Sequence, residues 1–122
     1  PVGDPAATSG PQGVAQSAPI VLNGENSGSS VNFVKGSAEV SGVVKSVELD
    51  PASVTLLDAS GSPVSEVVVP NVGTYTLNPE KTAVVFTPTA AFVGTAPAVT
   101  LQVTDLNGSK ATTTYTPTTT PV

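Results

Sequence analysis

Proline and glycine interrupt this chain at turn-like spacing from one end to the other, with 12 prolines and 11 glycines among 122 residues. Both residues are costly inside a helix, so the segments between them are too short and too often broken for long helices. The commonest residues in those segments are Val and Thr, with 21 and 17 copies. Because both are branched at Cβ, they suit the pleated surface of a strand. The chain is therefore predicted to be all-β.

The clearest strand covers residues 99–104, where Val99, Leu101 and Val103 alternate with polar residues. Such alternation is typical of a strand with one buried and one solvated face. Asn107-Gly108 then predicts a tight hairpin turn into a returning strand at 111–116. Further strands are predicted at 43–49, 53–57, 64–69, 73–77 and 83–87, and a short one at 31–35, with turns at Asp50-Pro51, 58–61 and 78–81. Residues 18–22 form the first apolar run of the chain.

About seven to eight short strands over roughly a hundred residues favour an Ig-like antiparallel β-sandwich over a barrel. Aromatic residues make up only 4% of the chain, so the core must consist of Val, Leu and a few rings. We expect the core to contain Val54, Leu56, Tyr75, Leu77, Phe86, Phe92, Val99, Leu101, Val103 and Tyr115.

The two ends of the chain differ in composition from its middle. Residues 1–17 are predicted to be a linker or a lead-in segment that pairs weakly, because they are rich in Pro and Gly and poor in large apolar side chains. A single β-sandwich repeat domain is expected at 18–117, followed by a Thr/Pro linker tail at 118–122. Two linker-like ends suggest one bead of a longer string, and the start at Pro1 suggests a mature product or an excised fragment.

His, Cys, Trp, Met and Arg are absent, and this excludes several kinds of site. A Ser-His-Asp triad, a Cys nucleophile and a zinc, haem or iron–sulfur centre all need residues that the chain lacks. With a net charge of -5 and no Arg, the chain has no basic surface of the kind that binds nucleic acid. No apolar stretch is long enough to span a membrane. We therefore predict no catalytic, cofactor-binding or metal-binding residues, no cofactor and no enzymatic activity.

Two turns carry oxygen ligands of the kind that calcium prefers. Asp105 and Asn107 form a D-x-N-G pattern, and Asp58 with Ser60 and Gly61 forms a weaker one. The first lacks the further acidic residues and the bidentate Glu of an EF-hand loop. A hairpin turn explains Asn107 without a metal ion, and we favour that interpretation.

Lys45 lies within an otherwise apolar predicted strand and shares a face with Val43, Val47 and Leu49. Buried lysines are costly, but surface adhesin domains can join such a lysine to Asn or Asp through an isopeptide bond beside a carboxylate. The alternatives are an edge strand protected by an inward charge, or a core face that contains Val44 instead.

The remaining candidates are weaker. A glycosidase needs a pair of carboxylates, and the chain offers Glu39, Glu48, Glu66 and Glu80, as would any acidic domain. No Trp is present to stack against a sugar. Asn107-Gly108-Ser109 is formally a glycosylation sequon, and the Thr/Pro tail could carry O-linked sugar. A hairpin turn and an extended linker explain the same residues.

Three segments in order resemble a known family. They are Thr8 to Ser17 (TSGPQGVAQS), Val54 to Asp105, and the close that runs from Asp105-Leu106-Asn107-Gly108-Ser109 to Tyr115-Thr116-Pro117. Together they are similar to the start, body and end of a CshA-type fibril repeat. The resemblance extends from Ala7 to Pro117, whereas Asn23 to Gly42 departs from the family's pattern and leaves the strand order there open.

The resemblance implies a structural role. Such repeats occur in tandem in cell-wall-anchored surface proteins of Gram-positive bacteria, where they form a fibrillar stalk below an adhesive tip. The implied partners are neighbouring repeats of the same chain, and the isolated domain is expected to be a monomer. The alternatives are a binding module for host or bacterial surface ligands, and homotypic association through the Val-rich edge at 67–69.

Overall fold

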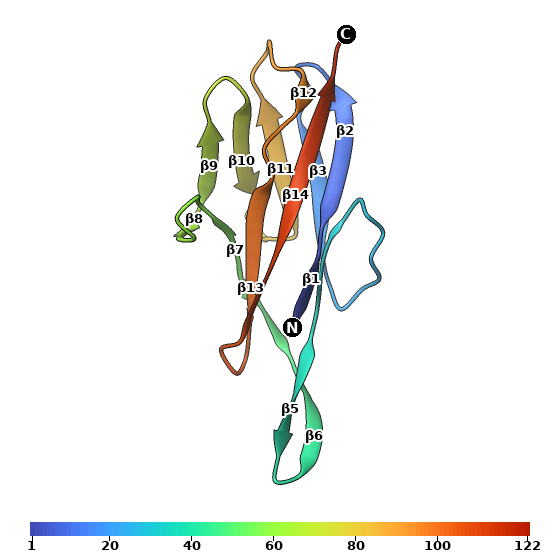
Figure 1. Ribbon diagram of the computed structural model, residues 1–122, viewed down its shortest axis with the longest axis vertical. Helices are drawn as coiled ribbons and strands as arrows, with labels where there is room; N and C mark the ends of the chain where they lie inside the picture. Colours follow the sequence, from blue (N-terminus) through green and yellow to red (C-terminus); the bar gives the residue numbers. More distant parts are fainter.

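The computed structural model describes all residues 1–122 and contains strands and turns but no helix (Figure 1). The all-β prediction is confirmed. The strands are β1 (Val2–Asp4), β2 (Ala6–Pro11), β3 (Gln16–Leu22), β4 (Val31–Val34), β5 (Gly36–Val40), β6 (Val43–Val47), β7 (Leu49–Leu57), β8 (Pro63–Val64), β9 (Glu66–Val69), β10 (Gly73–Leu77), β11 (Ala83–Pro88), β12 (Gly94–Thr95), β13 (Val99–Asp105) and β14 (Lys110–Thr120).

Two sheets pack face to face as a sandwich. Sheet A has the order β1-β4-β3-β11-β10-β9, and sheet B has the order β12-β14-β13-β7-β8, with β2 on the other edge of β14. The strands β5 and β6 form a separate two-stranded hairpin. Most neighbouring strands are antiparallel, as expected for an Ig-like sandwich, but β2 pairs with β14 and β3 with β4 in parallel. Fourteen strands replace the predicted seven or eight because several of them are short or interrupted.

The core lies between the two sheets and follows the alternation of the strands. In β13 every second side chain is buried, from Val99 to Asp105. Three rings meet near the centre, with ring centroids 5.0 Å apart for Tyr75 and Phe86 and 6.3 Å apart for Phe86 and Phe92. Eight of the ten predicted core residues are buried, whereas Leu77 and Phe92 are partly buried and pack against the core. The prediction missed the other ten of the eighteen buried apolar residues, among them the fully buried Val31 and Phe33 of β4 and Val84 of β11.

Two predicted strands and one predicted turn are wrong in detail. The predicted strand 43–49 ends at Val47, and the chain then passes from the hairpin into sheet B. Strand β7 continues through Asp50-Pro51, where a turn was expected. The pairing with β13 shifts here, because residues 51–54 of β7 form a bulge opposite Val103. The Ser53 hydroxyl bridges this bulge: it donates to the carbonyl of Thr104 and accepts from the amide of Thr104. The predicted strand 64–69 is divided at Ser65 between β8 in sheet B and β9 in sheet A.

The chain ends also differ from the expectation of weakly pairing linkers. Residues 1–17 contain β1 and β2 and the start of β3, and Ala6 is buried in the core. Strand β14 continues to Thr120, so most of the Thr/Pro tail is part of sheet B. Composition suggested linkers here because the segment has few large apolar side chains, yet pairing with neighbouring strands needs only the backbone.

The molecule is elongated, and its two ends carry different structures (Figure 1). The C-terminus lies at one end, beside the β2–β3 turn and the β11–β12 loop, and the β5–β6 hairpin projects from the other. The chain starts beside the base of this hairpin, because Val2 of β1 pairs with Val34 of β4. A Cβ built on Gly36 would lie 3.0 Å from the nitrogen of Pro1. The chain has no helix that is long and apolar enough to cross a membrane.

Candidate functional site: the junction of the first and last long strands

The longest parallel contact joins the two ends of the sequence. Strand β2 runs beside the second half of β14 with a continuous register, from Ala6 opposite Tyr115 to Pro11 opposite Thr120. The opposite edge of β14 pairs with β13 and, near its end, with β12. The register continues past β2, where the amide of Gln12 donates to the carbonyl of Thr120 over 2.8 Å. We call this contact of β2 with β14 the terminal clamp.

A side-chain network reinforces the terminal clamp from inside the sandwich. The Thr8 hydroxyl donates to Oε1 of Gln16 over 2.7 Å and lies 2.6 Å from the hydroxyl of Tyr115. Nε2 of Gln16 donates to the carbonyl of Thr118 over 2.8 Å. Gln16 is buried on β3, so this network links sheet A to the terminal clamp in sheet B. Buried polar groups with their hydrogen bonds made favour one arrangement over others.

The two tyrosines lie in the core with their hydroxyl groups hydrogen-bonded. The Tyr75 hydroxyl donates to the carbonyl of Pro97. Burial, and to a smaller extent the neighbouring Tyr115, raises the pKa of Tyr75 to about 12. Burial also raises the pKa of Tyr115 above its usual value. Both rings therefore act as neutral core residues that anchor backbone or network atoms, and neither is arranged as an acid or a base.

We expect Gln16→Ala to lower the free energy of unfolding by about 1–3 kcal/mol. The change leaves the Thr118 carbonyl and the Thr8 hydroxyl without the partner that Gln16 supplies inside the protein. Urea unfolding followed by circular dichroism would measure the loss. Gln12→Ala is the matched control, because its side chain makes one exposed hydrogen bond, to Ala90, and it should change stability by less than about 0.5 kcal/mol. Equal effects of the two changes would contradict a stabilising role for the network.

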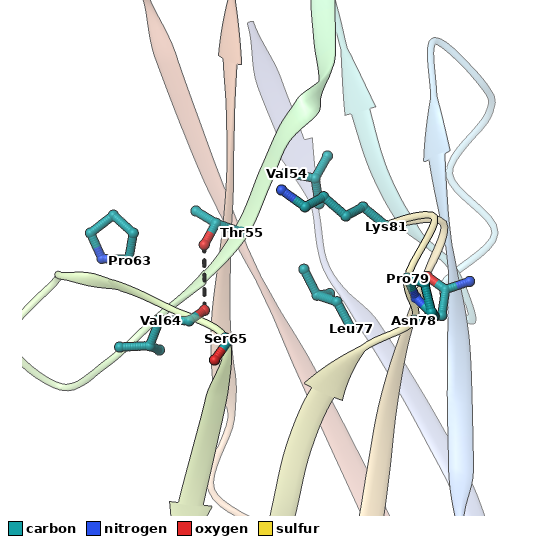
Figure 2. A pocket seen from close by; sticks show the side chains of 9 residues that line it. All are labelled: Val54, Thr55, Pro63, Val64, Ser65, Leu77, Asn78, Pro79 and Lys81. Atoms are coloured by element: carbon teal, nitrogen blue, oxygen red, sulfur yellow. Dashed lines mark hydrogen bonds between the residues drawn. The ribbon is translucent and has the colours of Figure 1, made fainter.

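The largest hollow lies at the open edge of the sandwich, between β7–β8 and the β10–β11 turn (Figure 2). Its volume is about 380 Å³, and its walls come from Val54, Thr55, Pro63, Val64, Ser65, Leu77, Asn78, Pro79 and Lys81. In Figure 2 the Lys81 side chain reaches across from the turn towards Val54. Its Nζ donates to the carbonyl of Ala52 over 2.9 Å. The hollow contains no carboxylate, and its one cation is already bonded to the backbone, so it has no pair of groups for acid–base chemistry.

The two turns that were weighed as calcium sites are closed by their own backbone. Oδ1 of Asp58 accepts from the amides of Ser60 and Ser62, each over 2.9 Å. Oδ1 of Asp105 accepts from the amides of Asn107 and Ser109, also over 2.9 Å. This is the usual role of Asp in a turn. The chain contains no cluster of three or more acidic, His or Cys side chains that could hold a metal ion.

Lys45 is exposed on the β5–β6 hairpin, where it lies opposite Ala38. The isopeptide hypothesis required a buried lysine, and the structure does not provide one. The alternative core face at Val44 is also wrong, because Val44 is 66% exposed. The sequence predicts that residues 43–49 belong to the sandwich because four of the seven are apolar. In fact this segment forms a hairpin that extends beyond the core.

The four glutamates and the sequon are dispersed. Glu39 lies on β5, Glu66 begins β9, Glu80 is in the β10–β11 turn, and all three are exposed. Glu48 forms a 2.7 Å ion pair with Lys35 at the base of the hairpin. Such an exposed pair contributes little to stability. Asn107 is exposed in the β13–β14 turn. The structure therefore brings none of the predicted carboxylates together as a catalytic pair.

Comparison with known proteins agrees with this architecture. A family model for the repetitive domain of the surface adhesin CshA matches residues 1–119. The chain belongs to this family. No curated protein matches the chain. The CshA repeat is a structural kind of domain from a surface adhesin, which places this chain at the extracellular surface. The match includes β1, β2 and almost all of β14, so the terminal clamp is part of the CshA repeat unit.

Proposed function

We propose that this CshA repeat is a structural stalk module of a secreted fibrillar adhesin anchored to the cell wall of a Gram-positive bacterium. It would be one bead in a tandem array that projects an adhesive tip, with neighbouring repeats as its partners and no enzymatic activity of its own. Membership of a surface adhesin repeat family supports this role. So does the placement of the terminal clamp, which is the observation that carries the proposal.

A stalk transmits tension from one end of each repeat to the other. Strand β2 follows β1 and begins about halfway along the molecule, and both β2 and β14 run to the end at which the C-terminus lies (Figure 1). Because β2 and β14 are parallel, pulling on both termini slides one strand along the other. The hydrogen bonds between Ala6–Pro11 and their partners are then loaded together, and none can open before the others. This geometry resists extension much better than strands that peel apart one bond at a time.

The alternative role, a binding module for surface ligands, has less support, because the chain exposes few side chains of the kind that dominate binding. Binding hot spots favour exposed Trp, Tyr and Arg. Both tyrosines of this chain are buried, and so are Phe33 and Phe86. The remaining ring, Phe92, packs partly against the core. The sequence that flanks this repeat in its gene also distinguishes the two roles. A stalk module should lie in a run of similar repeats followed by a wall-anchoring signal, whereas a binding module should occur once, near the tip.

Pulling the same folded chain in two directions tests the stalk proposal. The chain has no Cys, so Gln12→Cys creates a single attachment point next to Thr120. Pulling between the two termini shears the terminal clamp, whereas pulling between position 12 and the C-terminus peels it. We expect the peeling geometry to unfold at a several-fold lower force, since forced unfolding depends on the barrier along the pulling direction.

The control is the Gln12→Cys variant pulled from its two termini, which should behave like the unchanged chain. Similar unfolding forces in the shearing and peeling geometries would show that the terminal clamp does not resist tension. The stalk proposal would then lose its main support.

A further inference from the structure

The β5–β6 hairpin and the β13–β14 turn enclose a groove at the end of the molecule where the chain starts. The groove has a volume of about 300 Å³ and is lined by Ala38, Val40, Lys45, Ser46, Val47, Glu48, Leu106 and Asn107. Val40 is 61% exposed and Leu106 is 69% exposed. Exposed apolar side chains that gather around a hollow indicate an interaction site more strongly than scattered ones do. We call this hollow the hairpin groove.

The apolar side chains of the hairpin are divided between its two faces. Val40 and Val43 are directly opposite each other in the hairpin, so they share a face with Ala38 and Lys45, which line the groove. Val44 is paired with Glu39 on the opposite face. Successive residues of a strand point to opposite faces. Val40 therefore lies on the groove face and Val44 on the outer face. Their side chains are similarly exposed, at 61% and 66%, so they form a matched pair for comparison.

The opposite end of the molecule is apolar and uncharged. It contains the β2–β3 turn (12–15), the β9–β10 turn (70–72) and the β11–β12 loop (89–93), as seen at the top of Figure 1. None of the thirteen charged side chains of the protein lies in these three segments. Val14 is 51% exposed and Val93 is 43% exposed there. An uncharged surface loses little hydration free energy when it is covered.

A tandem chain would bring these two ends together. The last strand of one repeat finishes at its uncharged end, and β1 of the next repeat lies beside the base of its own hairpin, where it pairs with β4. The hairpin points away from its own sandwich, in the direction from which the chain arrives (Figure 1). It has five paired residues in each strand, so it extends about 16 Å along this direction. A short connection between repeats would therefore place the preceding repeat within reach of the hairpin groove.

We propose that the hairpin groove of each repeat receives the uncharged end of the preceding repeat, a second copy of the same fold. Val14 and Val93 of the preceding copy would pack against Val40, Val43 and Leu106. This docking rests on the tandem arrangement proposed above and goes beyond it. It turns a string of beads into a jointed rod, since each junction is held by an apolar contact as well as by the linker. The occupant is a folded end of the same protein, because only such an end is tethered beside the groove.

Disulfide trapping in a chain of two joined copies tests the docking. The protein has no Cys, so each cross-link has one origin. In the first copy Val14→Cys or Val93→Cys supplies one thiol, and in the second copy Val40→Cys supplies the other. We expect at least one of these pairs to form a disulfide roughly tenfold faster than the same pair with Val44→Cys in place of Val40→Cys. The two hairpin positions lie at similar distances from the linker, so tethering alone would give equal rates.

Equal rates for Val40→Cys and Val44→Cys, or faster trapping of Val44→Cys, would overturn the proposal. Cross-links between the Val40→Cys positions of two separate chains, at the rate seen within one chain, would also overturn it. Such links would mean that two grooves face each other. Trapping does not depend on mechanical strength. If the disulfides form as expected but the repeat unfolds at low force, the stalk proposal fails and the docking proposal stands. If the repeat resists force but the disulfides do not form preferentially at Val40→Cys, the docking proposal fails and the stalk proposal stands.

A charge at the contact provides a second test that leaves the hairpin unchanged. Val14→Asp together with Val93→Asp in the first copy places carboxylates where we expect an apolar contact. Nuclear magnetic relaxation of the two-copy chain should then report two repeats that tumble more independently. Val40→Asp together with Val44→Asp in the first copy is the matched control, since both residues are exposed (61% and 66%) and lie on the first copy's own hairpin, at the end opposite the uncharged turns. If the double variant tumbles like the unchanged two-copy chain, the proposal is wrong.

Discussion

Phe86→Ala is expected to lower the free energy of unfolding by about 3–5 kcal/mol. Phe86 is fully buried on β11 and contacts the rings of both Tyr75 and Phe92. Its removal leaves a cavity at the centre of a core that has few other large side chains to fill it. A domain of this size has a total stability of roughly 5–15 kcal/mol, so the variant should be close to unfolding. Chemical denaturation followed by circular dichroism would measure the change.

Val68→Ala is the matched control for this prediction. It removes apolar atoms from a strand of the same sheet, but Val68 is 61% exposed. The expected change is below about 0.5 kcal/mol. A loss of less than about 1 kcal/mol for Phe86→Ala would mean that neighbouring side chains collapse into the cavity. The core would then be more adaptable than its close ring contacts indicate.

Alkaline pH is expected to destabilise the fold through its two tyrosines. Tyrosine in an unfolded chain ionises near pH 10, whereas burial raises the pKa of Tyr75 to about 12. Between about pH 10 and 12 the unfolded state therefore binds fewer protons than the folded state, and the free energy of unfolding falls as the pH rises. Tyr75 alone would account for roughly 2 kcal/mol by about pH 12. Tyr115 adds to the loss, because burial raises its pKa as well.

Denaturation curves recorded at a series of pH values would measure this loss, and tyrosinate absorbance would show when the hydroxyl groups ionise. In Tyr75→Phe the decline above about pH 10 should be shallower, because only Tyr115 still contributes. At neutral pH the same variant loses the hydrogen bond to the Pro97 carbonyl and should be slightly less stable. Tyrosinate absorbance that rises around pH 10 in the folded protein would contradict the prediction.

Local patterns in the sequence were sufficient to predict much of the sandwich. The alternation in 99–104 and the Asn107-Gly108 turn correspond to β13, the β13–β14 turn and β14. The predicted hairpin at 73–77 and 83–87 corresponds to β10 and β11. These elements are adjacent in sequence and pair with each other. Their periodicity and their turn residues therefore contain all the information that the pairing needs.

Local patterns failed where a segment changes its partner. Residues 64–69 contain four valines and were predicted to form one strand. Val64 pairs with β7, however, and Glu66–Val69 pair with β10 in the other sheet. Residues 43–49 read as one core strand, yet they are divided between the hairpin and β7. No local signal marks these divisions, because a strand's own sequence does not specify which neighbour lies beside it.

The features that we connect with function come from contacts across the whole chain. The Thr8–Tyr115 and Gln16–Thr118 hydrogen bonds join residues that are more than a hundred positions apart. Thr8 and Gln16 lie in a segment whose composition predicted a linker. The hairpin groove likewise combines β5 and β6 with a turn that is distant in sequence. The one sequence signal that pointed towards the hairpin was the unusual lysine, Lys45, and its chemical interpretation was wrong.

By itself the sequence determined the β class, the identity of eight of the eighteen buried apolar residues and the lack of His and Cys side chains. Each of these follows from residue types and short-range periodicity, which are properties of single segments. Tertiary structure alone decided that β2 is parallel to β14 and that β5 and β6 leave the core. Which strands become neighbours is settled by the burial of all apolar faces in one core at once. That condition applies to the whole chain, so no part of the sequence can show it in isolation.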